Sequence, residues 1–280
     1  MAELLEGKKA ADKIIAEVSE AVKREKCNLI LAVVLVGDDK ASELYVKKKE
    51  EACLKAGIAS IKRILPADTQ EEKLLSMIRG LNENPLVGAI LVQVPLPEHI
   101  SEKRVMREIS PQKDVDCFHP ENTAKLYEGD FELAPCTPRG IMDLIGEYGI
   151  SLEGKHVVIV GRSNAVGKPL ALMMLAKNAT VTVAHSKTKN LAEHTKMADI
   201  LVCAVGKRNL ITADMVKEGV IVIDAGIVRE GGKVYGDVEF EGVSKKASRI
   251  TPVPGGVGPM TIAGLMKNTL ILYERKKKWI

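Results

Sequence analysis

The spacing of apolar residues along the chain changes repeatedly between that of a helix and the unbroken run of a buried strand. Ile14, Val18 and Val22 recur at helical spacing in a polar segment, which predicts a helix with one face on a core. The run LILAVVLVG (29–37) suits a strand that is covered on both faces. In this part of the chain, the patterns predict helices at 7–25, 41–57 and 71–84 and strands at 29–37, 61–65 and 87–94.

A second series of the same kind follows an irregular stretch at 95–136, which is rich in Pro, Asp and His. It predicts helices at 137–149, 167–178 and 258–278 and strands at 155–161, 179–186, 198–206 and 220–226. Strands that alternate with helices form parallel sheets with right-handed crossovers. The sequence therefore predicts an α/β protein of two three-layer domains with a cleft between them. The first domain is expected over 1–134, and the second, over 135–257, is expected to be Rossmann-like.

The turn after the predicted strand at 155–161 has the residues expected of a dinucleotide site. Gly161 permits a tight turn, Gly167 permits close backbone approach, and the helix that follows offers free N–H groups to an anion. The spacing is not GxGxxG, so a turn that binds nothing remains an alternative. Further along, Gly226 follows a strand and would let the backbone of Ile227 approach a nicotinamide ring.

The end of the next predicted strand indicates which dinucleotide is bound. An NAD site usually places Asp or Glu there, on the ribose hydroxyls. This chain has His185, Ser186, Lys187 and Thr188 instead, and Ser with nearby cations would accept a ribose phosphate. Arg162 can pair with the same phosphate. The sequence thus favours NADP over NAD, and a solvated polar strand end is the alternative.

Candidate chemistry in the first half of the chain lies on one predicted helix and one strand end. Tyr45 and Lys49 are four residues apart and share a helix face, whereas Lys47 and Lys48 point elsewhere and are expected to be solvated. A partly desolvated amine can serve as an acid or base, although a lysine on a charged helix is more often a solvated surface residue without a catalytic role. Gln93 interrupts an apolar strand at its carboxyl end, where ligands of parallel sheets bind.

The irregular stretch adds two carboxylates and two rigid turns. Asp114 and Asp116 could hold a metal, but no ligand cluster accompanies them, so a loop aspartate that accepts hydrogen bonds from a ligand fits better. No metal is expected. The turns PCTP (135–138) and TPVPGGVGPMT (251–261) open helices and can line a site with backbone N–H groups.

Composition excludes several classes of protein. Hydrophobic residues at 46% and charged residues at 28% are in the globular range, and a net charge of +4 with 3% aromatics argues against nucleic-acid binding. The longest apolar run, about eight residues, is shorter than the roughly 20 of a membrane span. There is no apolar signal core at the start, and the five cysteines form no CxxC. A cytoplasmic protein with no membrane partner is the expectation.

Together these segments resemble one family, the bifunctional methylenetetrahydrofolate dehydrogenase/methenyltetrahydrofolate cyclohydrolases. The matching segments, in the family's order, are YVKKK (45–49), VQVPLP (92–97), PQKDVDCFHP (111–120), PCTPRG (135–140), VGRSNAVGKP (160–169), HSKT (185–188) and TPVPGGVGPMT (251–261). The resemblance covers nearly the whole chain. It implies a homodimer, and it implies that the final helix, 258–280, returns to the first domain.

The resemblance also implies an activity and a role for each residue. Methylenetetrahydrofolate would be oxidised with NADP, and the methenyl product hydrolysed to formyltetrahydrofolate, within one-carbon metabolism that feeds purine biosynthesis. Lys49 would be the acid/base, Tyr45 would stack on the folate, Gln93 would hydrogen-bond Lys49, and Asp116 would anchor the pterin. The other residues implied are Gly161, Arg162, Ser163, Ser186 and Ile227 for the cofactor, and Pro254, Gly255 and Gly256 for the substrate.

One residue departs from the family pattern. The family has Gly after the second Asp of KDVDG, and this chain has Cys117. If that position is left-handed, Cys costs about 1–2 kcal/mol. If Gly is there to admit the pterin, the sulfur would crowd it and weaken folate binding. The alternatives are therefore a dehydrogenase whose cyclohydrolase step is weakened or lost, a different NADP dehydrogenase, and a non-catalytic NADP-binding protein.

Overall fold

The computed structural model describes residues 2–28, 30–38 and 40–277, which form two compact units. Unit 1 contains Met1–Asp12 and Thr137–Thr261, and unit 2 contains Lys13–Cys136 and Ile262–Ile280. The chain passes from one unit to the other within helix α1 (Gly7–Arg24), before Thr137, and within helix α10 (Val257–Lys277).

Unit 2 is built on a three-stranded parallel sheet in the order β3-β2-β4. The strands are β2 (Ile30–Val36), β3 (Ala59–Leu65) and β4 (Val87–Val92). The helices between and after them are α2 (Lys40–Ala56), α3 (Glu71–Glu83), α4 (Glu102–Glu108) and α5 (Pro120–Tyr127). Helix α2 ends where Gly57 adopts a φ of +71°, a conformation that glycine supplies without strain. The central strand β2 is buried along almost its whole length, as its unbroken apolar run predicts.

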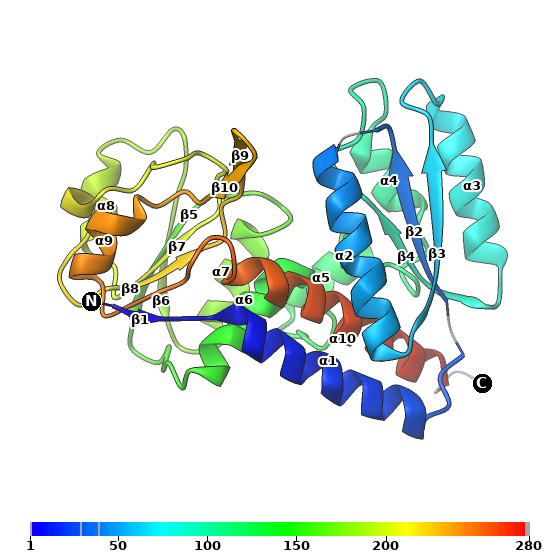
Figure 1. The fold of residues 1–280 in the computed structure, drawn as a ribbon, viewed down its shortest axis with the longest axis horizontal. Coiled ribbons are helices and arrows are strands. Elements are labelled where there is room, and N and C mark those ends of the chain that lie inside the picture. The colour runs from blue at the N-terminus through cyan, green and yellow to red at the C-terminus, as the bar shows by residue number, and fades with distance from the viewer. Residues whose placement is uncertain (1, 29, 39, 278–280) are drawn as a thin grey trace. The chain divides into compact units, whose positions relative to one another are not determined.

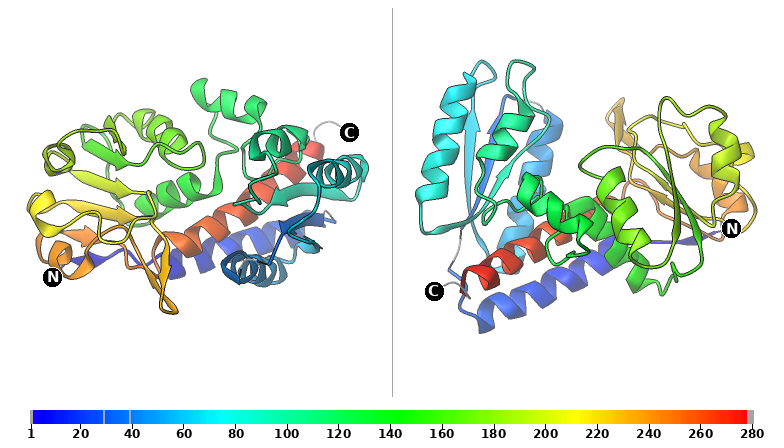
Figure 2. Two further views of the ribbon diagram at one scale, coloured as in Figure 1. Left: turned by 90° about the horizontal axis from the view of Figure 1, so that it is seen from above. Right: turned by 180° about the vertical axis from the view of Figure 1, so that it is seen from behind.

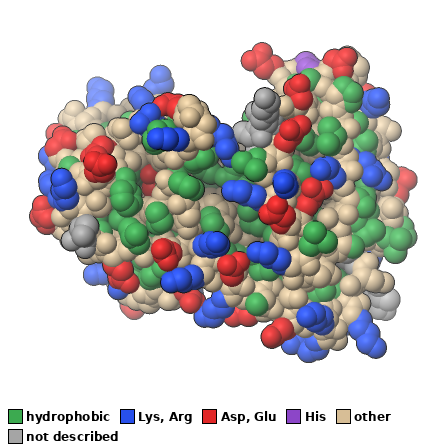
Figure 3. Space-filling view, in the orientation of Figure 1, with side chains coloured by type: hydrophobic (Ala, Val, Ile, Leu, Met, Phe, Trp, Pro, Cys, Tyr) green, Lys and Arg blue, Asp and Glu red, His purple; other side chains and the backbone are tan. Residues whose placement is uncertain are grey.

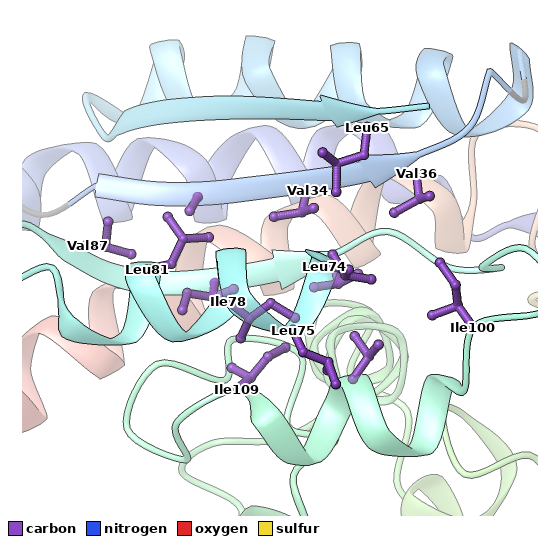
Figure 4. Close-up of a cluster of buried hydrophobic side chains, with 14 residues drawn as sticks. Val34, Val36, Leu65, Leu74, Leu75, Ile78, Leu81, Val87, Ile100 and Ile109 are labelled. Carbon is purple, nitrogen blue, oxygen red and sulfur yellow. The ribbon is translucent and has the colours of Figure 1, made fainter. Parts of the chain in front are cut away.

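The core of unit 2 lies between the sheet and α3 with α4 (Figure 4). Leu74, Leu75 and Ile78 on α3 lie among the side chains between the strands and α4, at the i, i+1, i+4 spacing of one helix face. They pack with Val34 of β2 and Val87 of β4. In the same unit, the end of α10 lies beside the end of α1 (Figures 1 and 2), where the Tyr273 hydroxyl donates to the Glu25 carbonyl at 3.1 Å.

Unit 1 is built on a six-stranded parallel sheet in the order β1-β11-β8-β7-β5-β6. The strands are β1 (Glu3–Leu4), β5 (His156–Val160), β6 (Thr180–Ala184), β7 (Ile200–Cys203), β8 (Ile221–Asp224) and β11 (Arg249–Ile250). A small antiparallel pair, β9 (Val228–Glu230) and β10 (Lys233–Tyr235), follows β8. The helices are α6 (Cys136–Glu147), α7 (Gly167–Leu175), α8 (Leu191–Lys196), α9 (Phe240–Lys246) and the 3-10 turn η1 (Ala213–Met215).

The register of this sheet brings four strand ends into line. Val160 pairs with Ala184 of β6 and with Cys203 of β7, and Cys203 pairs with Asp224 of β8. The residues that follow these four positions therefore leave the sheet along one edge, which is the carboxyl edge where parallel sheets bind ligands.

The structure confirms the α/β class with parallel sheets and places a helix or strand at every segment predicted from periodicity. It adds short elements that were not predicted, including α4 and α5 within the irregular stretch at 95–136. Each has only seven or eight residues, about two turns, which is too short for periodicity to stand out. Residues 1–12 lie in unit 1 because β1 pairs with β11, although the boundary expected at 1–134 assigned them to the other domain.

The surface carries charges of both signs. In the face shown in Figure 3, lysine and arginine side chains are interspersed with aspartate and glutamate rather than gathered into one field. Within the described residues, we find no helix whose length and apolar character would let it span a lipid bilayer.

Candidate functional site

The turn after β5 is as tight as the two glycines suggested. Gly161 has a φ of +131°, and a Cβ on it would overlap the carbonyl oxygen of Ala204. A Cβ on Gly167, the first residue of α7, would overlap the carbonyl oxygen of Gly161. Glycine at 161 therefore lets the turn pack against the residue after β7, and glycine at 167 lets the start of α7 pack against the turn.

Polar side chains of this turn are exposed and partly pre-ordered. The Ser163 hydroxyl accepts from the backbone N–H of Val166 at 3.1 Å, which fixes the turn ahead of α7. Arg162 is exposed, and the Lys168 ammonium donates to the Asn164 side chain at 2.8 Å. The turn thus presents exposed cations of the kind that bind phosphate, directly ahead of the N-terminus of α7.

The end of β6 lies beside this turn, because Ala184 of β6 pairs with Val160 at the end of β5. The backbone N–H of His185 donates to the Thr188 hydroxyl at 2.9 Å, and that of Lys187 donates to the His185 ring at 3.1 Å. These bonds make a compact turn that leaves Ser186 and Lys187 exposed. No carboxylate stands in this turn, which agrees with a site for a phosphorylated ribose.

Two buried carboxylates, which sequence analysis missed, hold the ends of β7 and β8. Asp237 is fully buried and accepts from the backbone N–H of Val205 at 2.6 Å and of Lys207 at 2.7 Å. Asp224 is also buried and accepts from Gly226 at 2.9 Å, Asp237 at 3.0 Å and a third backbone N–H, that of Val238, at 2.9 Å.

Gly226 also makes room for a neighbouring side chain, a role that the sequence did not suggest. A Cβ at this position would overlap the carboxylate of Asp237, so the glycine makes room for that side chain. A Cβ on Gly236 would in turn overlap the carboxylate of Asp224. Ile227, next to Gly226, keeps 40% of its surface exposed, which is unusual for an isoleucine and consistent with a ligand-facing position.

Burial at this strand edge shifts the pKa of Asp224 and of the neighbouring Cys203 thiol. Burial raises the pKa of Asp224 to about 6, against an ordinary 3.8, although the three backbone N–H groups oppose the rise. The Cys203 thiol is fully buried beside Asp224 and Asp237, and its pKa is raised well above the ordinary value by burial first and by the two carboxylates second. Cys203 is therefore an inert core thiol.

In unit 2, the structure brings Lys49 and Gln93 together. Lys49 Nζ on α2 donates to Gln93 Oε1 at 2.9 Å, and Gln93 Nε2 donates to the carbonyl of Val94 at 2.7 Å. The backbone N–H of Gln93 donates to Val34 at 2.8 Å and so continues the sheet beyond β4. Because Nε2 must face a carbonyl, Oε1 must face the amine, and the orientation of the amide is determined.

The neighbours of Lys49 on α2 behave as their spacing predicts. Tyr45, one turn before it, is half-buried like Lys49 itself, whereas Lys47 and Lys48 are exposed. The helix therefore presents a phenol and an amine on a partly covered face and two solvated amines on another.

The aspartates of the irregular stretch have different environments. Asp114 is buried and accepts from the backbone N–H of His119 at 2.8 Å and from the Asn122 side chain at 3.0 Å. Burial raises the pKa of Asp114, and these hydrogen bonds oppose the rise. Asp116 is half-buried. Asp114 thus shapes the loop, and Asp116 is the one of the two that is open to a ligand.

Cys117 occupies the left-handed region, with a φ of +59°. Its side chain is fully buried, and the thiol lies 3.5 Å from the carbonyl oxygen of Leu133, to which it donates. Cys117 therefore has the left-handed backbone that strains any residue with a Cβ. The thiol faces the interior of unit 2, so it offers no accessible surface to a pterin.

The last predicted loop, in unit 1, closes on the start of α1. The backbone N–H of Gly7 donates to Gly255 at 2.9 Å, and that of Gly256 donates to Pro252 at 2.8 Å. Gly255 has a φ of +114°. Pro254 and Gly255 therefore sit in a firmly held turn ahead of α10. Among the residues that the structure describes, no three His, Cys, Asp or Glu side chains converge as a metal ion would require.

Comparison with known proteins gives a consistent result over the whole chain. Residues 5–116 match the family model of the tetrahydrofolate dehydrogenase/cyclohydrolase catalytic domain, and residues 135–277 match that of the NAD(P)-binding domain. The bifunctional protein FolD of Campylobacter hominis is 54% identical over 284 residues, with 99% of each chain covered. That of Moorella thermoacetica is 54% identical over 278 residues and covers 98% of this chain and 99% of its own.

Solved structures agree. The bifunctional FolD enzyme of Campylobacter jejuni has a TM-score of 0.95 at 48% identity and covers 99% of this chain and 100% of its own. The Trypanosoma brucei methylenetetrahydrofolate dehydrogenase-cyclohydrolase, solved with NADP cofactor and an inhibitor, has a TM-score of 0.94 at 35% identity and covers 99% of each chain.

Proposed function

Because this chain belongs to the tetrahydrofolate dehydrogenase/cyclohydrolase family, we propose that it oxidises methylenetetrahydrofolate to methenyltetrahydrofolate with NADP and hydrolyses the product to formyltetrahydrofolate. The observation that carries this proposal is the hydrogen bond between Lys49 and Gln93, since it orients an amine that binding of NADP alone does not require.

The residues of unit 1 fit NADP. The close packing at Gly161 and Gly167 leaves backbone N–H groups for a pyrophosphate, and Arg162 with Ser186 suits a ribose phosphate. Ser163 fixes the turn, and Ile227 offers an exposed apolar side chain to the nicotinamide. When bound, NADP supplies the acceptor for a hydride from the bridging carbon of the folate.

The residues of unit 2 account for the folate side. Tyr45 stacks on the aminobenzoate ring, and Asp116 accepts hydrogen bonds from the pterin. Oxidation leaves a methenyl cation that two nitrogens stabilise and that is already electrophilic. Water adds to its carbon, and the neutral Lys49 amine takes one proton from that water. The hydroxyl proton of the adduct then passes to the departing nitrogen as its carbon–nitrogen bond breaks, which leaves a formyl group on the other nitrogen. Gln93 holds the Lys49 amine in place for this step. In unit 1, we assign a part in substrate binding to the rigid turn of Pro254, Gly255 and Gly256.

Replacement of Lys49 by Met tests the proposal. We expect cyclohydrolase activity to fall by at least about 10²-fold, because the proton acceptor is lost, while NADP binding is unchanged. Lys47→Met is the matched control, since Lys47 is exposed on the same helix and should leave both properties intact. Full hydrolysis by Lys49→Met protein would remove Lys49 from the proposed role.

Methenyl absorbance separates the proposal from its alternatives. With methylene substrate and NADP, a dehydrogenase without cyclohydrolase accumulates the methenyl compound, whereas a bifunctional enzyme consumes it. With methenyl substrate and no NADP, only cyclohydrolase activity removes the absorbance. A non-catalytic NADP-binding protein would produce neither signal, and a different dehydrogenase would form no NADPH from the folate.

We further infer that the protein works as a homodimer in the cytoplasm and that its formyl product serves purine biosynthesis. The edge strand β6 supports an association through unit 1, since Val183 on it is exposed and Leu175, at the end of α7, is 59% exposed. Light scattering of the purified protein tests this: Val183→Lys should shift a dimer toward monomer, and a monomeric unmodified protein would contradict the inference.

A further inference from the structure

Two strand ends of unit 1 carry exposed apolar side chains, and at both ends a buried carboxylate accepts hydrogen bonds from the backbone. Val205, after β7, has 47% of its surface exposed, and Ile227, after β8, has 40%. The register of β7 and β8 pairs Cys203 with Asp224, so both side chains leave the sheet at neighbouring positions of the same edge. Exposed apolar side chains side by side at this edge are suited to a flat ring.

A single carboxylate connects these two strand ends. Asp237 accepts from the backbone N–H of Val205 through one oxygen and of Lys207 through the other, at 2.6 and 2.7 Å. The same carboxylate lies against the Cα of Gly226, where no larger residue would fit. It therefore determines both the shape of the turn at 205–207 and the spacing between that turn and the backbone before Ile227.

A second carboxylate holds the first in place. Asp224 accepts from the backbone N–H of Asp237 at 3.0 Å and from that of Gly226 at 2.9 Å. The Thr251 hydroxyl accepts from the backbone N–H of Asp224 at 2.7 Å and secures the strand end itself. Both carboxylates are buried and satisfied by backbone donors, so they contribute shape rather than a surface charge.

We propose that Asp237 is a positioning residue for the cofactor: with Asp224 behind it, it presets the Val205–Lys207 turn and Ile227 in the form that receives the nicotinamide half of NADP. This rests on the proposed function, because it assigns the ligand of this edge to NADP. Asp237 itself touches neither substrate nor cofactor. It acts by removing the ordering cost that a loose turn would add to binding.

The test compares Asp237→Asn with Asp199→Asn. Asp199 is a matched control, because it also accepts from a backbone N–H, that of His156 at 2.8 Å, but at the opposite edge of the sheet, before β7. In Asp237→Asn, one of the two N–H groups faces an amide donor instead of an oxygen. We expect NADP to bind about tenfold more weakly, measured by calorimetry, with cyclohydrolase activity on methenyl substrate changed by less than about twofold.

The outcomes separate the inference from the proposed function. If the unmodified protein binds no NADP, the proposed function fails. If it binds NADP and Asp237→Asn binds as tightly as Asp199→Asn, the inference is wrong and the proposed function stands. Loss of cyclohydrolase activity in parallel with NADP binding would show a general structural role and would also overturn the inference.

A measurement on the unmodified protein covers the case in which Asp237→Asn does not fold. Hydrogen exchange should show the amides of Val205 and Lys207 protected before NADP is added, with little further slowing afterwards, because the carboxylate already holds them. Fast exchange without NADP, followed by strong protection with it, would mean that the cofactor orders the turn and would refute presetting by Asp237.

Discussion

Replacement of Cys117 gives an unusual order of stability, because its backbone is left-handed. At a φ of +59°, any residue with a Cβ pays about 1–2 kcal/mol that glycine does not pay. Glycine loses about 0.4–1 kcal/mol of this stability advantage, because its unfolded chain has more conformational freedom. The fully buried Cβ is worth about 0.8 kcal/mol to alanine. We therefore expect Cys117→Gly and Cys117→Ala to be of about equal stability.

The sulfur adds a second contribution. Cys117 is fully buried and its thiol donates to the Leu133 carbonyl, so removal of the sulfur should cost about 1 kcal/mol, close to the value of one buried methylene. The native cysteine should then be more stable than either variant by about 1 kcal/mol.

Urea unfolding of the three proteins measures this order, and Cys53 provides the matched control. Cys53 is also fully buried in unit 2, but it lies within helix α2, where glycine is about 1 kcal/mol worse than alanine. Alanine should therefore be more stable than glycine by about 1–2 kcal/mol at Cys53 and by almost nothing at Cys117. If alanine is favoured over glycine by the same amount at both cysteines, backbone strain is not what distinguishes Cys117.

Kinetics of the same variants test whether the thiol disturbs the substrate. Because the sulfur is buried against Leu133, we expect Cys117→Gly to leave the Michaelis constant for the folate within about twofold of the native value. A marked fall in that constant would show that the sulfur crowds the pterin.

Three further predictions concern single positions. Ser186→Asp should weaken NADP binding by about tenfold and NAD binding far less, because a carboxylate would repel the ribose phosphate; equal losses in titrations of both cofactors would refute this. Between about pH 4 and pH 6 Asp224 is protonated in the folded state and ionised in the unfolded state, so its contribution to the free energy of unfolding should fall by up to about 3 kcal/mol as the pH rises, and Asp224→Asn should remove that contribution in urea titrations. Asn268→Ala should destabilise the protein by about 2–3 kcal/mol in urea unfolding, because its buried amide donates to the carbonyls of Val115 and Ala134 at 2.8 Å; a loss below about 0.5 kcal/mol would contradict this.

The main strands and helices were predictable because their burial leaves a direct trace in the sequence. Strand β2 is covered on both faces, so it reads as an unbroken apolar run, and α3 has one buried face, so it reads as a helical period. Strands β1 and β11 have two residues each and exist only because they pair across the chain. A pairing between residues 3 and 249 cannot be predicted from a local sequence pattern.

The candidate site was predictable to the extent that its residues are exposed or partly buried at strand ends. Gly161, Ser186 and Gln93 all follow a strand, and parallel sheets bind ligands there whatever the chain. The hydrogen bond between Lys49 and Gln93 was an implication of the family resemblance rather than of spacing, since 44 residues separate the two. Spacing alone placed Lys49 beside Tyr45 and no further.

The buried carboxylates were missed for a physical reason that also shows how they could be found. An acidic residue at a strand end can face a ligand or turn inward onto backbone donors, and the residue type is the same in both cases. What differs is the space around it. Asp224 and Asp237 each occupy room that a glycine leaves, Gly236 for the first and Gly226 for the second, so each aspartate lies over the glycine beside the other. In this chain, the Asp-Ala-Gly at the end of β8 and the Gly-Asp after β10 are therefore the trace of two carboxylates that turn inward and shape this edge of the sheet.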